Sequence, residues 1–463
     1  MNYKTPGVYV EEISIFPPSV AQVETPIPAF IGYTQKGPTT PEKIKSLVDY
    51  EALYGGPANE LPDFAIDAAG AISGAIPGTP TYKLYYALQL YFGNGGGPCY
   101  IISAGGFSTP PNVDPAELQA GLALLKKEDE PTMILFPDAP GNTDLYKAAM
   151  QQCADLGDRF AICDVTPVSD LTDPAGKSAE PFRNDIGTNN LMYAAAYYPN
   201  LATSLTFVPK ESSINVTADN ALLAGNTVKV LRYTEEEIAG GEDQEESLFH
   251  AGNGELKQLY IDIKNKIADA TLEMPPSGAL AGVYAAVDST RGVWKAPANV
   301  SLNLVKKPTV HLENSEQDGL NVSDTGKSIN AIRFFTGKGV MVWGARTLDG
   351  NSNEWRYVSV RRFFNMVEES VMKATERFVF EPNDANTWTK VKAMIENFLI
   401  LQWRAGALMG AKAEQAFFVK VGLGETMTQD DVLNGKMIVE IGMAVVRPAE
   451  FIILRFSHKM LES

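Results

Sequence analysis

The sequence predicts an α/β fold whose central sheet is parallel and covered by helices on both faces. Three short apolar segments carry this prediction: CYIISA at 99–104, TMILF at 132–136 and RFAICDV at 159–165. Two stretches with the spacing of amphipathic helices separate them, and strands that are apolar on both faces are typical of buried parallel sheets. The chain has 463 residues, 45% apolar and 21% charged, so it can bury a large core and form about three domains of ~150 residues each.

The helices between these strands have recognisable ends. Asp114 and Pro115 predict the N-cap and first position of one helix, and a second helix near 144–156 should stop at Gly157. Upstream, the expected elements are a strand at 30–33, a helix that begins at Thr40 with Pro41 at its first position, and a helix at 81–92.

Residues 205–255 interrupt this alternation. The segment is polar, punctuated by glycine and strongly acidic at TEEEIAGGEDQEES, residues 234–247. We interpret it as an inserted acidic loop or small β subdomain on an outer surface, and a solvated linker is the alternative. Helical patterning resumes at 256–267 and again in the small-residue segment PPSGALAGVYAAVD, residues 275–288.

The last 115 residues mix helices and strands and predict an α+β domain. We expect helices at 362–376 and 385–409, and the β-rich segments are YVSVRR (357–362), AFFVKV (416–421), KMIVEIGMAVV (436–446) and EFIILRF (450–456). The N-terminus carries another one, TPGVYVEEIS at 5–14, with apolar side chains on both faces. A chain with β-rich segments at both extremities can donate strands to another chain or accept them.

Charge and composition exclude several classes of protein. The net charge of −17 argues against nucleic-acid binding, which depends on Lys and Arg. The charge is uneven: residues 331–463 hold 17 basic and 15 acidic side chains, whereas residues 1–330 hold 22 and 41. No apolar run is long enough to span a membrane, and the N-terminus lacks the pattern of a signal peptide. We therefore expect assembly in a bacterial cytoplasm and no membrane insertion.

A hydrolase is the strongest enzymatic hypothesis. Ser277 begins a small-residue helix, and Asp138 and Asp164 follow parallel strands, an arrangement that resembles a subtilisin-type enzyme. A serine nucleophile needs a base within hydrogen-bond reach, but nothing places any of the three histidines beside Ser277. Three scattered cysteines and no clustered carboxylates provide no metal site. We expect no catalytic residue, metal or cofactor, and interpret Ser277 as a helix cap.

Several longer motifs occur in order along the chain. They are PGVYVEEIS at the start, PPSGALAGVYAAVDSTRGVWKAPAN (275–299), INAIRFFTGKGVMVWGARTL (329–348), EWRYVSVRR (354–362), FVFEPND (378–384) with Trp388, FLILQWRAGALMG (398–410), EQAFFVK (414–420) and RPAEFIIL (447–454). Through these motifs the sequence resembles the sheath proteins of contractile tails, and most closely the sheaths of extracellular contractile injection particles.

The resemblance implies a structural polymer, stacked as rings around an inner tube, that shortens to drive the tube through a membrane. It also implies a subtilisin-like core without catalysis at 23–348, holding the acidic insertion, and a C-terminal polymerisation domain at 349–463. Family members link subunits through terminal arms, here residues 1–22 and about 450–457. A component of a type VI secretion-like sheath is the alternative, and a serine hydrolase is a weaker one.

The resemblance also implies sites and partners. Strand exchange between subunits is expected at Val8, Tyr9, Val10, Glu11, Ile13, Phe451, Ile452, Ile453 and Leu454. The uneven charge suggests an inner-tube contact at MTQDDVLNGK (427–436), where Thr428 should cap a short acidic helix; its candidate residues are Thr428, Asp430, Asp431 and Lys436. The expected partners are other copies of the chain, the inner tube protein, baseplate and tail-terminator proteins, and optionally paralogous sheath proteins.

Overall fold

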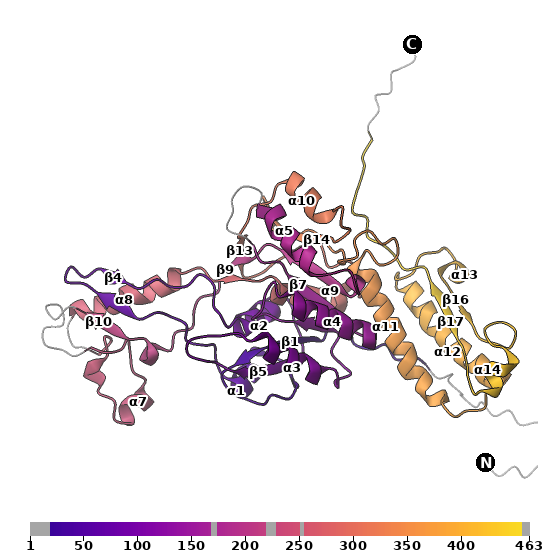
Figure 1. The fold of residues 1–463 in the computed structure, drawn as a ribbon, viewed down its shortest axis with the longest axis horizontal. Coiled ribbons are helices and arrows are strands. Elements are labelled where there is room, and N and C mark those ends of the chain that lie inside the picture. The colour runs from indigo at the N-terminus through magenta and orange to yellow at the C-terminus, as the bar shows by residue number, and fades with distance from the viewer. Residues whose placement is uncertain (1–18, 168–173, 219–227, 251–253, 456–463) are drawn as a thin grey trace, which may run out of the picture. The chain divides into compact units, whose positions relative to one another are not determined.

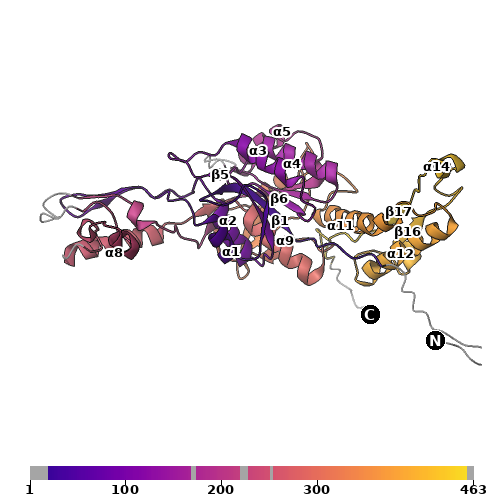
Figure 2. The same ribbon diagram turned by 90° about the horizontal axis from the view of Figure 1, so that it is seen from below.

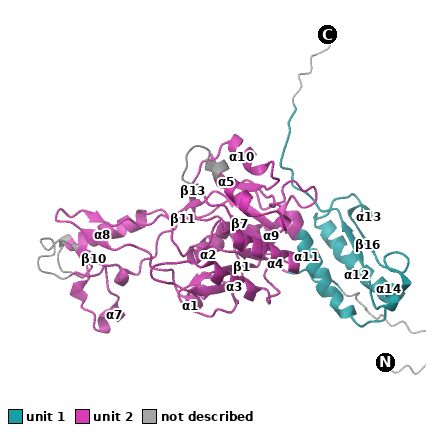
Figure 3. Cartoon of the chain, viewed as in Figure 1, with its two compact units in different colours: residues 1–23, 363–463 teal, residues 24–362 magenta. Residues whose placement is uncertain are grey.

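A computed structural model describes residues 19–167, 174–218, 228–250 and 254–455. The chain divides into two compact units (Figures 1 and 3): a core unit of residues 24–362 and a C-terminal unit of residues 1–23 and 363–463. Each unit has its own hydrophobic interior, and the two are described separately below.

The core unit is built on a nine-stranded sheet with the order β12-β15-β14-β8-β7-β6-β1-β5-β2. In this order the strands are Val300–Ser301, Gly339–Val342, Ile329–Phe335, Ala194–Tyr198, Phe160–Asp164, Met133–Leu135, Pro28–Thr34, Cys99–Gly106 and Glu42–Ile44. The six strands from β14 to β5 are mutually parallel, and the remaining three join at the edges through antiparallel pairs. The predicted parallel sheet is therefore confirmed.

Helices cover both faces of this sheet (Figure 2). One face carries α1 (Leu47–Tyr54), α2 (Leu84–Gly93) and α9 (Ser277–Arg291); the other carries α3 (Pro115–Leu125), α4 (Thr143–Leu156) and α5 (Pro174–Asp185). Alternate residues of β1 point into two separate hydrophobic clusters, Phe30 into one and its neighbours Ala29 and Ile31 into the other. Helix α10 (Asn314–Asn321) packs against α5 and β14.

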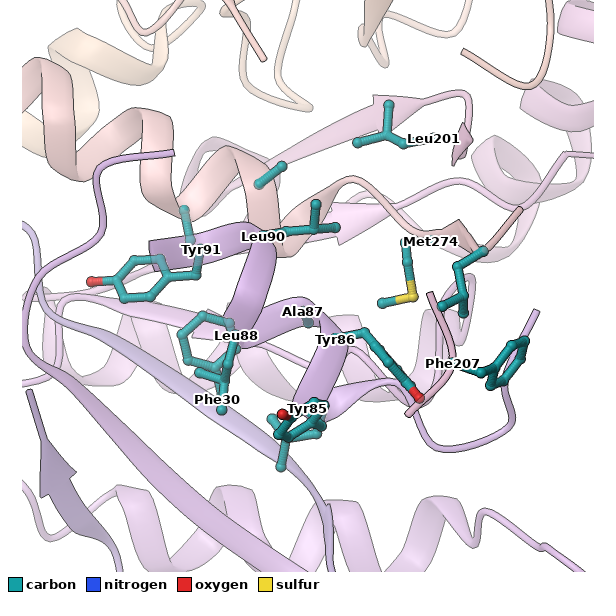
Figure 4. Close-up of a cluster of buried hydrophobic side chains, with 14 of the residues drawn as sticks. Phe30, Tyr85, Tyr86, Ala87, Leu88, Leu90, Tyr91, Leu201, Phe207 and Met274 are labelled. Atoms are coloured by element: carbon teal, nitrogen blue, oxygen red, sulfur yellow. The ribbon is translucent and has the colours of Figure 1, made fainter. Parts of the chain in front are cut away.

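Helices α2 and α9 approach each other unusually closely, which explains the small-residue motif. A methyl group on Gly278 would lie 2.7 Å from the carbonyl oxygen of Ala87, and one on Gly282 would overlap the carbonyl oxygen of Tyr91. Figure 4 shows the large side chains of α2 packed in the cluster with Phe30, Leu201, Phe207 and Met274. The two glycines, four residues apart, form the groove on α9 that admits α2.

Two sequence-based assignments in this unit have clear outcomes. Helix α3 begins at Pro115 after the N-cap Asp114, as predicted. The helix expected at Thr40 is wrong: the chain forms β2, and α1 starts only after Ser46, whose side chain accepts a hydrogen bond from the N–H of Asp49. Pairing of Ile44 with Cys99, both fully buried, favours the strand over an exposed helical turn.

The acidic segment is folded together with a distant part of the chain. Strand β10 (Val216–Ala218) pairs in parallel with β3 (Phe64–Ile66), which also pairs with β4 (Ile72–Ser73). The 3-10 turn η2 (Glu211–Ser213) precedes β10, and the short helices α7 (Glu235–Ala239) and η3 (Gln244–Glu246) and the longer α8 (Gly254–Asp269) follow it. Ile214, Leu231 and Leu248 are fully buried, so the described part of this segment does not behave as a solvated linker.

A second small sheet lies beside this region. It has the order β11-β9-β13, and its strands are Glu273–Met274, Leu201–Thr203 and Val305–Pro308. The 3-10 turn η1 (Leu191–Tyr193) precedes β8.

The C-terminal unit combines long helices with a two-stranded sheet. Its elements are α11 (Val358–Thr375), which begins in the core unit, η4 (Glu376–Phe378), α12 (Ala385–Arg404), α13 (Ala413–Ala416), β16 (Phe417–Lys420), α14 (Gln429–Leu433) and β17 (Glu440–Met443). The strand expected at 357–362 is wrong, because α11 already starts at Val358. Buried Phe363, Met366 and Val367 continue with helical spacing, which a six-residue window does not reveal.

No helix in the described part of the chain is long and apolar enough to cross a membrane.

Candidate functional site in the C-terminal unit

The sheet β16–β17 exposes unpaired backbone. The two strands are antiparallel, with Phe417 opposite Met443 and Lys420 opposite Glu440, and among the described residues they form a sheet of two strands only. Each strand therefore has one edge whose N–H and C=O groups face no further strand. Such edges are templates for a strand from another chain.

A run of four apolar residues near the C-terminus is almost fully exposed. Phe451, Ile452, Ile453 and Leu454 are 71–79% exposed and belong to no helix or strand. The expectation that this segment forms a strand is thus wrong within the isolated chain. Four consecutive exposed apolar side chains are unfavourable in water, and a segment of this kind marks an interaction site. The N-terminal candidates Val8, Tyr9, Val10, Glu11 and Ile13 lie outside the described residues.

The chain that follows the N-terminal arm is fixed to the C-terminal unit. The N–H of Val23 donates to Ser370 Oγ at 3.1 Å, and Gln402 Nε2 donates to Gln22 Oε1 at 3.0 Å. Val20 is buried, with 8% of its surface exposed. Residues 19–23 therefore run along α11 and α12, although no sequence pattern links these segments.

The predicted tube-contact residues lie on one short turn of the same unit. Thr428 caps α14: its Oγ1 accepts from the N–H of Asp431 at 3.2 Å, while the Asp431 carboxylate accepts from the Thr428 N–H at 3.0 Å. The Thr428 side chain and then its N–H hold the pKa of Asp431 below its ordinary value. The N–H of Lys436 donates to Asp431 O at 2.8 Å. The predicted N-cap is confirmed.

The hydrolase candidates of the core unit lie close together but are sealed from solvent. The N–H of Ser277 donates to Asp164 Oδ1 at 2.8 Å, and Ser277 is 0% exposed. Asp138 accepts from the N–H groups of Tyr33 at 2.7 Å and Leu84 at 2.9 Å. The two carboxylates thus lie at the N-termini of α9 and α2, where a negative charge is favoured. Ser277 itself is the first residue of α9 and follows the N-cap Pro276, so its interpretation as the cap is wrong by one position.

Burial controls the ionisation of this cluster. It raises the pKa of Asp164 to about 7, although the hydrogen bond from the Ser277 N–H and the charge of Lys83 act in the opposite direction. Burial also raises the pKa of Asp138 and lowers that of Lys83, and the two groups partly offset each other's shift. His250 instead contacts Ser247 Oγ at 2.6 Å, and His458 lies outside the described residues. The Ser277 hydroxyl is thus buried, and His250 is paired with Ser247 instead.

A buried ion pair near the end of the core unit was missed from the sequence. Arg362 donates to both carboxylate oxygens of Asp288, at 3.0 and 2.6 Å, and its Nη2 also donates to the backbone carbonyl of Thr25 at 3.0 Å. Both charged side chains are less than 5% exposed. Arg362 is the last residue of the core unit and Thr25 is the second, so the hydrogen bond between them joins the two ends of this unit.

Comparison with known proteins identifies the class. A model of the phage tail sheath protein central domain matches residues 128–348, and one of the phage tail sheath C-terminal domain matches 351–459. The tail sheath protein of Vibrio phage KVP40 is 27% identical over 150 residues, which are 32% of this chain and 21% of that protein. For the tail sheath protein of Enterobacteria phage T4 the values are 24% over 157 residues, 33% and 22%. The matched region spans about a fifth of these relatives.

Solved structures match over the whole length. The PVC sheath complex of an extracellular contractile injection system, in its contracted state, is 31% identical, with a TM-score of 0.67 and coverage of 99% of both chains. The contracted helical sheath of the anti-feeding prophage is 32% identical, with a TM-score of 0.64 and coverage of 99% of this chain and 100% of that one. These similarities define a structural protein of the contractile-sheath class. The chain belongs to the phage tail sheath family, and the predicted resemblance is confirmed.

Proposed function

We propose that this chain is the structural subunit of a contractile sheath, which polymerises as stacked rings around an inner tube and contracts to drive the tube through a target membrane. The observation that carries the proposal is the similarity over 99% of both chains to a sheath complex solved in its contracted state. The subunit would form part of a phage tail-like or extracellular contractile particle assembled in a bacterial cytoplasm.

Strand exchange is the proposed link between subunits. The unpaired edges of β16 and β17 would accept the arms of neighbouring copies, residues 1–22 and about 450–457. Pairing adds backbone hydrogen bonds worth about 0.5–1.5 kcal/mol each, and burying apolar side chains such as Ile452 and Ile453 adds about 1.5–3 kcal/mol each. Because the arms are tethers, subunits can move relative to one another while they remain linked.

The energy for contraction would be stored during assembly. We infer an extended state that is kinetically trapped and releases free energy as new surface between subunits is buried.

The remaining partners follow from the same proposal. Thr428, Asp430, Asp431 and Lys436 are proposed to face the inner tube protein. A related chain is part of the anti-feeding prophage baseplate, at 32% identity, which supports an association with baseplate proteins. Tail-terminator proteins, and optionally paralogous sheath proteins, would complete the particle.

A non-enzymatic role is also part of the proposal. The core unit would be a subtilisin-like fold that has lost catalysis, in agreement with the fully buried Ser277. A serine-reactive phosphonate probe tests this directly. Labelling that disappears in Ser277→Ala would contradict the proposal.

A type VI secretion-like sheath is the second candidate. Such sheaths are usually built from two different chains, whereas this single chain aligns with whole sheath subunits. Obligate co-purification with a small second sheath protein would favour the alternative.

Deletion of residues 1–15 tests strand exchange. The shortened chain should remain a folded monomer and form no tubes, as judged by circular dichroism and negative-stain microscopy. Tubes of normal length from this variant would rule out the proposed role of the N-terminal arm.

A charge reversal at Asp430 and Asp431 tests the proposed inner-tube contact, and it should reduce co-sedimentation with the inner tube protein.

A further inference from the structure

The loop between α11 and α12 holds an aromatic side chain entirely in solvent. Phe380 is fully exposed, at 103% of its reference surface, and Val379 beside it is 63% exposed. Phe380 also has a φ of +69°, a left-handed conformation that is unfavourable for a residue with a side chain. Exposure of the aromatic ring to water and the positive φ of its backbone each cost free energy. The combination suggests that the ring has a binding role.

The loop is held by its own hydrogen bonds. The N–H of Val379 donates to Glu376 O and that of Glu381 donates to Phe378 O, both at 3.1 Å. On the following side Asp384 caps α12. The ring is therefore presented in a defined position, as an anchor residue of an interface requires. We name Val379 and Phe380 the knob.

Acidic side chains flank the knob along the chain. Glu376, Glu381 and Asp384 are exposed, and none of them forms an ion pair with another described residue. The guanidinium of the neighbouring Arg377 donates hydrogen bonds to the backbone carbonyl oxygens of Ala374 and Ser19. A surface that receives the knob should therefore be apolar and carry basic groups.

The other end of α12 has these properties. Leu401 is 60% and Met409 48% exposed, and the basic side chains of Arg404 and Lys412 are exposed beside them along the chain. Trp403 Nε1 donates to Gly410 O at 2.9 Å, which holds the loop after α12 against its last turn. We name Leu401, Arg404, Met409 and Lys412 the basic patch.

The knob cannot reach the basic patch of its own chain. They lie at opposite ends of α12, and a helix of 20 residues is about 30 Å long. We propose that the knob of one copy docks on the basic patch of a second copy, forming a head-to-tail contact in addition to the exchanged arms. A contact between two different surfaces continues from copy to copy and builds rings or helices instead of closed dimers.

The first test uses the full-length chain alone, without tube protein, and rests on the proposed polymerisation. Phe380→Asn removes the ring but tolerates the left-handed backbone, so the monomer should fold normally. We expect its critical concentration for polymerisation, measured by sedimentation, to rise at least tenfold. Val48→Asn, at another exposed apolar position, 72% exposed in the core unit, is the control and should change nothing.

A charge swap identifies the partner surface. Glu381→Lys and Lys412→Glu should each weaken polymerisation, and the double variant should restore it, because the two charges meet across the contact. Unchanged polymerisation of Phe380→Asn, or no rescue in the double variant, overturns the inference. Failure of the unmodified chain to polymerise would instead contradict the proposed function. A defect of Phe380→Asn seen only with tube protein present would assign the knob to the tube.

Discussion

The two units differ in where their apolar side chains are. Among the described residues, the C-terminal unit holds 13 of the 22 large apolar side chains that are exposed, although it is much the smaller unit. The core unit buries its apolar residues in two clusters, one on each face of the sheet. The core unit therefore buries most of its apolar side chains within one chain. The C-terminal unit instead exposes apolar side chains of the kind that protein–protein contacts cover.

Breaking the buried ion pair should have the largest effect on folding. Arg362→Met leaves the Asp288 carboxylate buried without its partner, which costs about 3–5 kcal/mol. Urea unfolding followed by circular dichroism measures the change. The double variant Arg362→Met, Asp288→Leu should recover much of this loss because no charge remains buried. A double variant as unstable as the single one would show that the loss comes from packing or from the bond to Thr25.

Filling the groove between α2 and α9 should have the next largest effect. Gly282→Ala forces the helices apart, since its methyl group would overlap the carbonyl oxygen of Tyr91, and should cost about 1–3 kcal/mol. Gly319→Ala in α10 is the matched control. Its methyl group would meet no atom within 4 Å, so the variant should gain about 0.5–1 kcal/mol from helix propensity. Equal effects of the two changes would contradict the close approach.

The sequence revealed local elements of the fold but not the pairs formed by residues far apart in the chain. Local signals predicted β5, β6, β7 and the caps Asp114 and Thr428, because apolar runs and capping side chains act over a few residues. Pairing of β10 with β3 joins segments about 150 residues apart and has no local pattern. The same holds for Arg362 in α11 and Asp288 in α9, which pair across 74 residues of sequence.

The sequence revealed the apolar composition of the candidate site but not its secondary structure. The apolar run from Phe451 to Leu454 was visible, yet periodicity could not tell a strand within the chain from one that lacks its partner. The exposed Phe380 was missed because a positive φ at a phenylalanine has no propensity signal.

The pH dependence of the core unit provides a further test. The pKa of Asp164 is about 7 in the folded protein, above its value in the unfolded chain, so between these values the folded state binds more protons. Its contribution to stability is greatest at low pH and is lost as the pH rises through about 7. Asp164→Asn removes this titration, so the decline in unfolding free energy from pH 5 to pH 8 should be about 2–3 kcal/mol smaller than in the unmodified chain. An identical decline in both proteins would show that Asp164 ionises normally.

The smallest effect on folding should come from the exposed arm, and it separates the two units most clearly. Ile452→Asp with Ile453→Asp changes side chains that are more than 75% exposed, so the unfolding free energy should shift by less than about 0.5 kcal/mol. Assembly should nevertheless fail, because two carboxylates would have to be buried in the sheet of the neighbouring copy. Negative-stain microscopy and sedimentation measure this outcome. Phe334→Asp, at a position of the core unit that is 48% exposed, is the control and should leave polymerisation intact. If both variants polymerised equally well, the exposed apolar run would have no part in assembly, and the excess of exposed apolar surface in the C-terminal unit would need another partner.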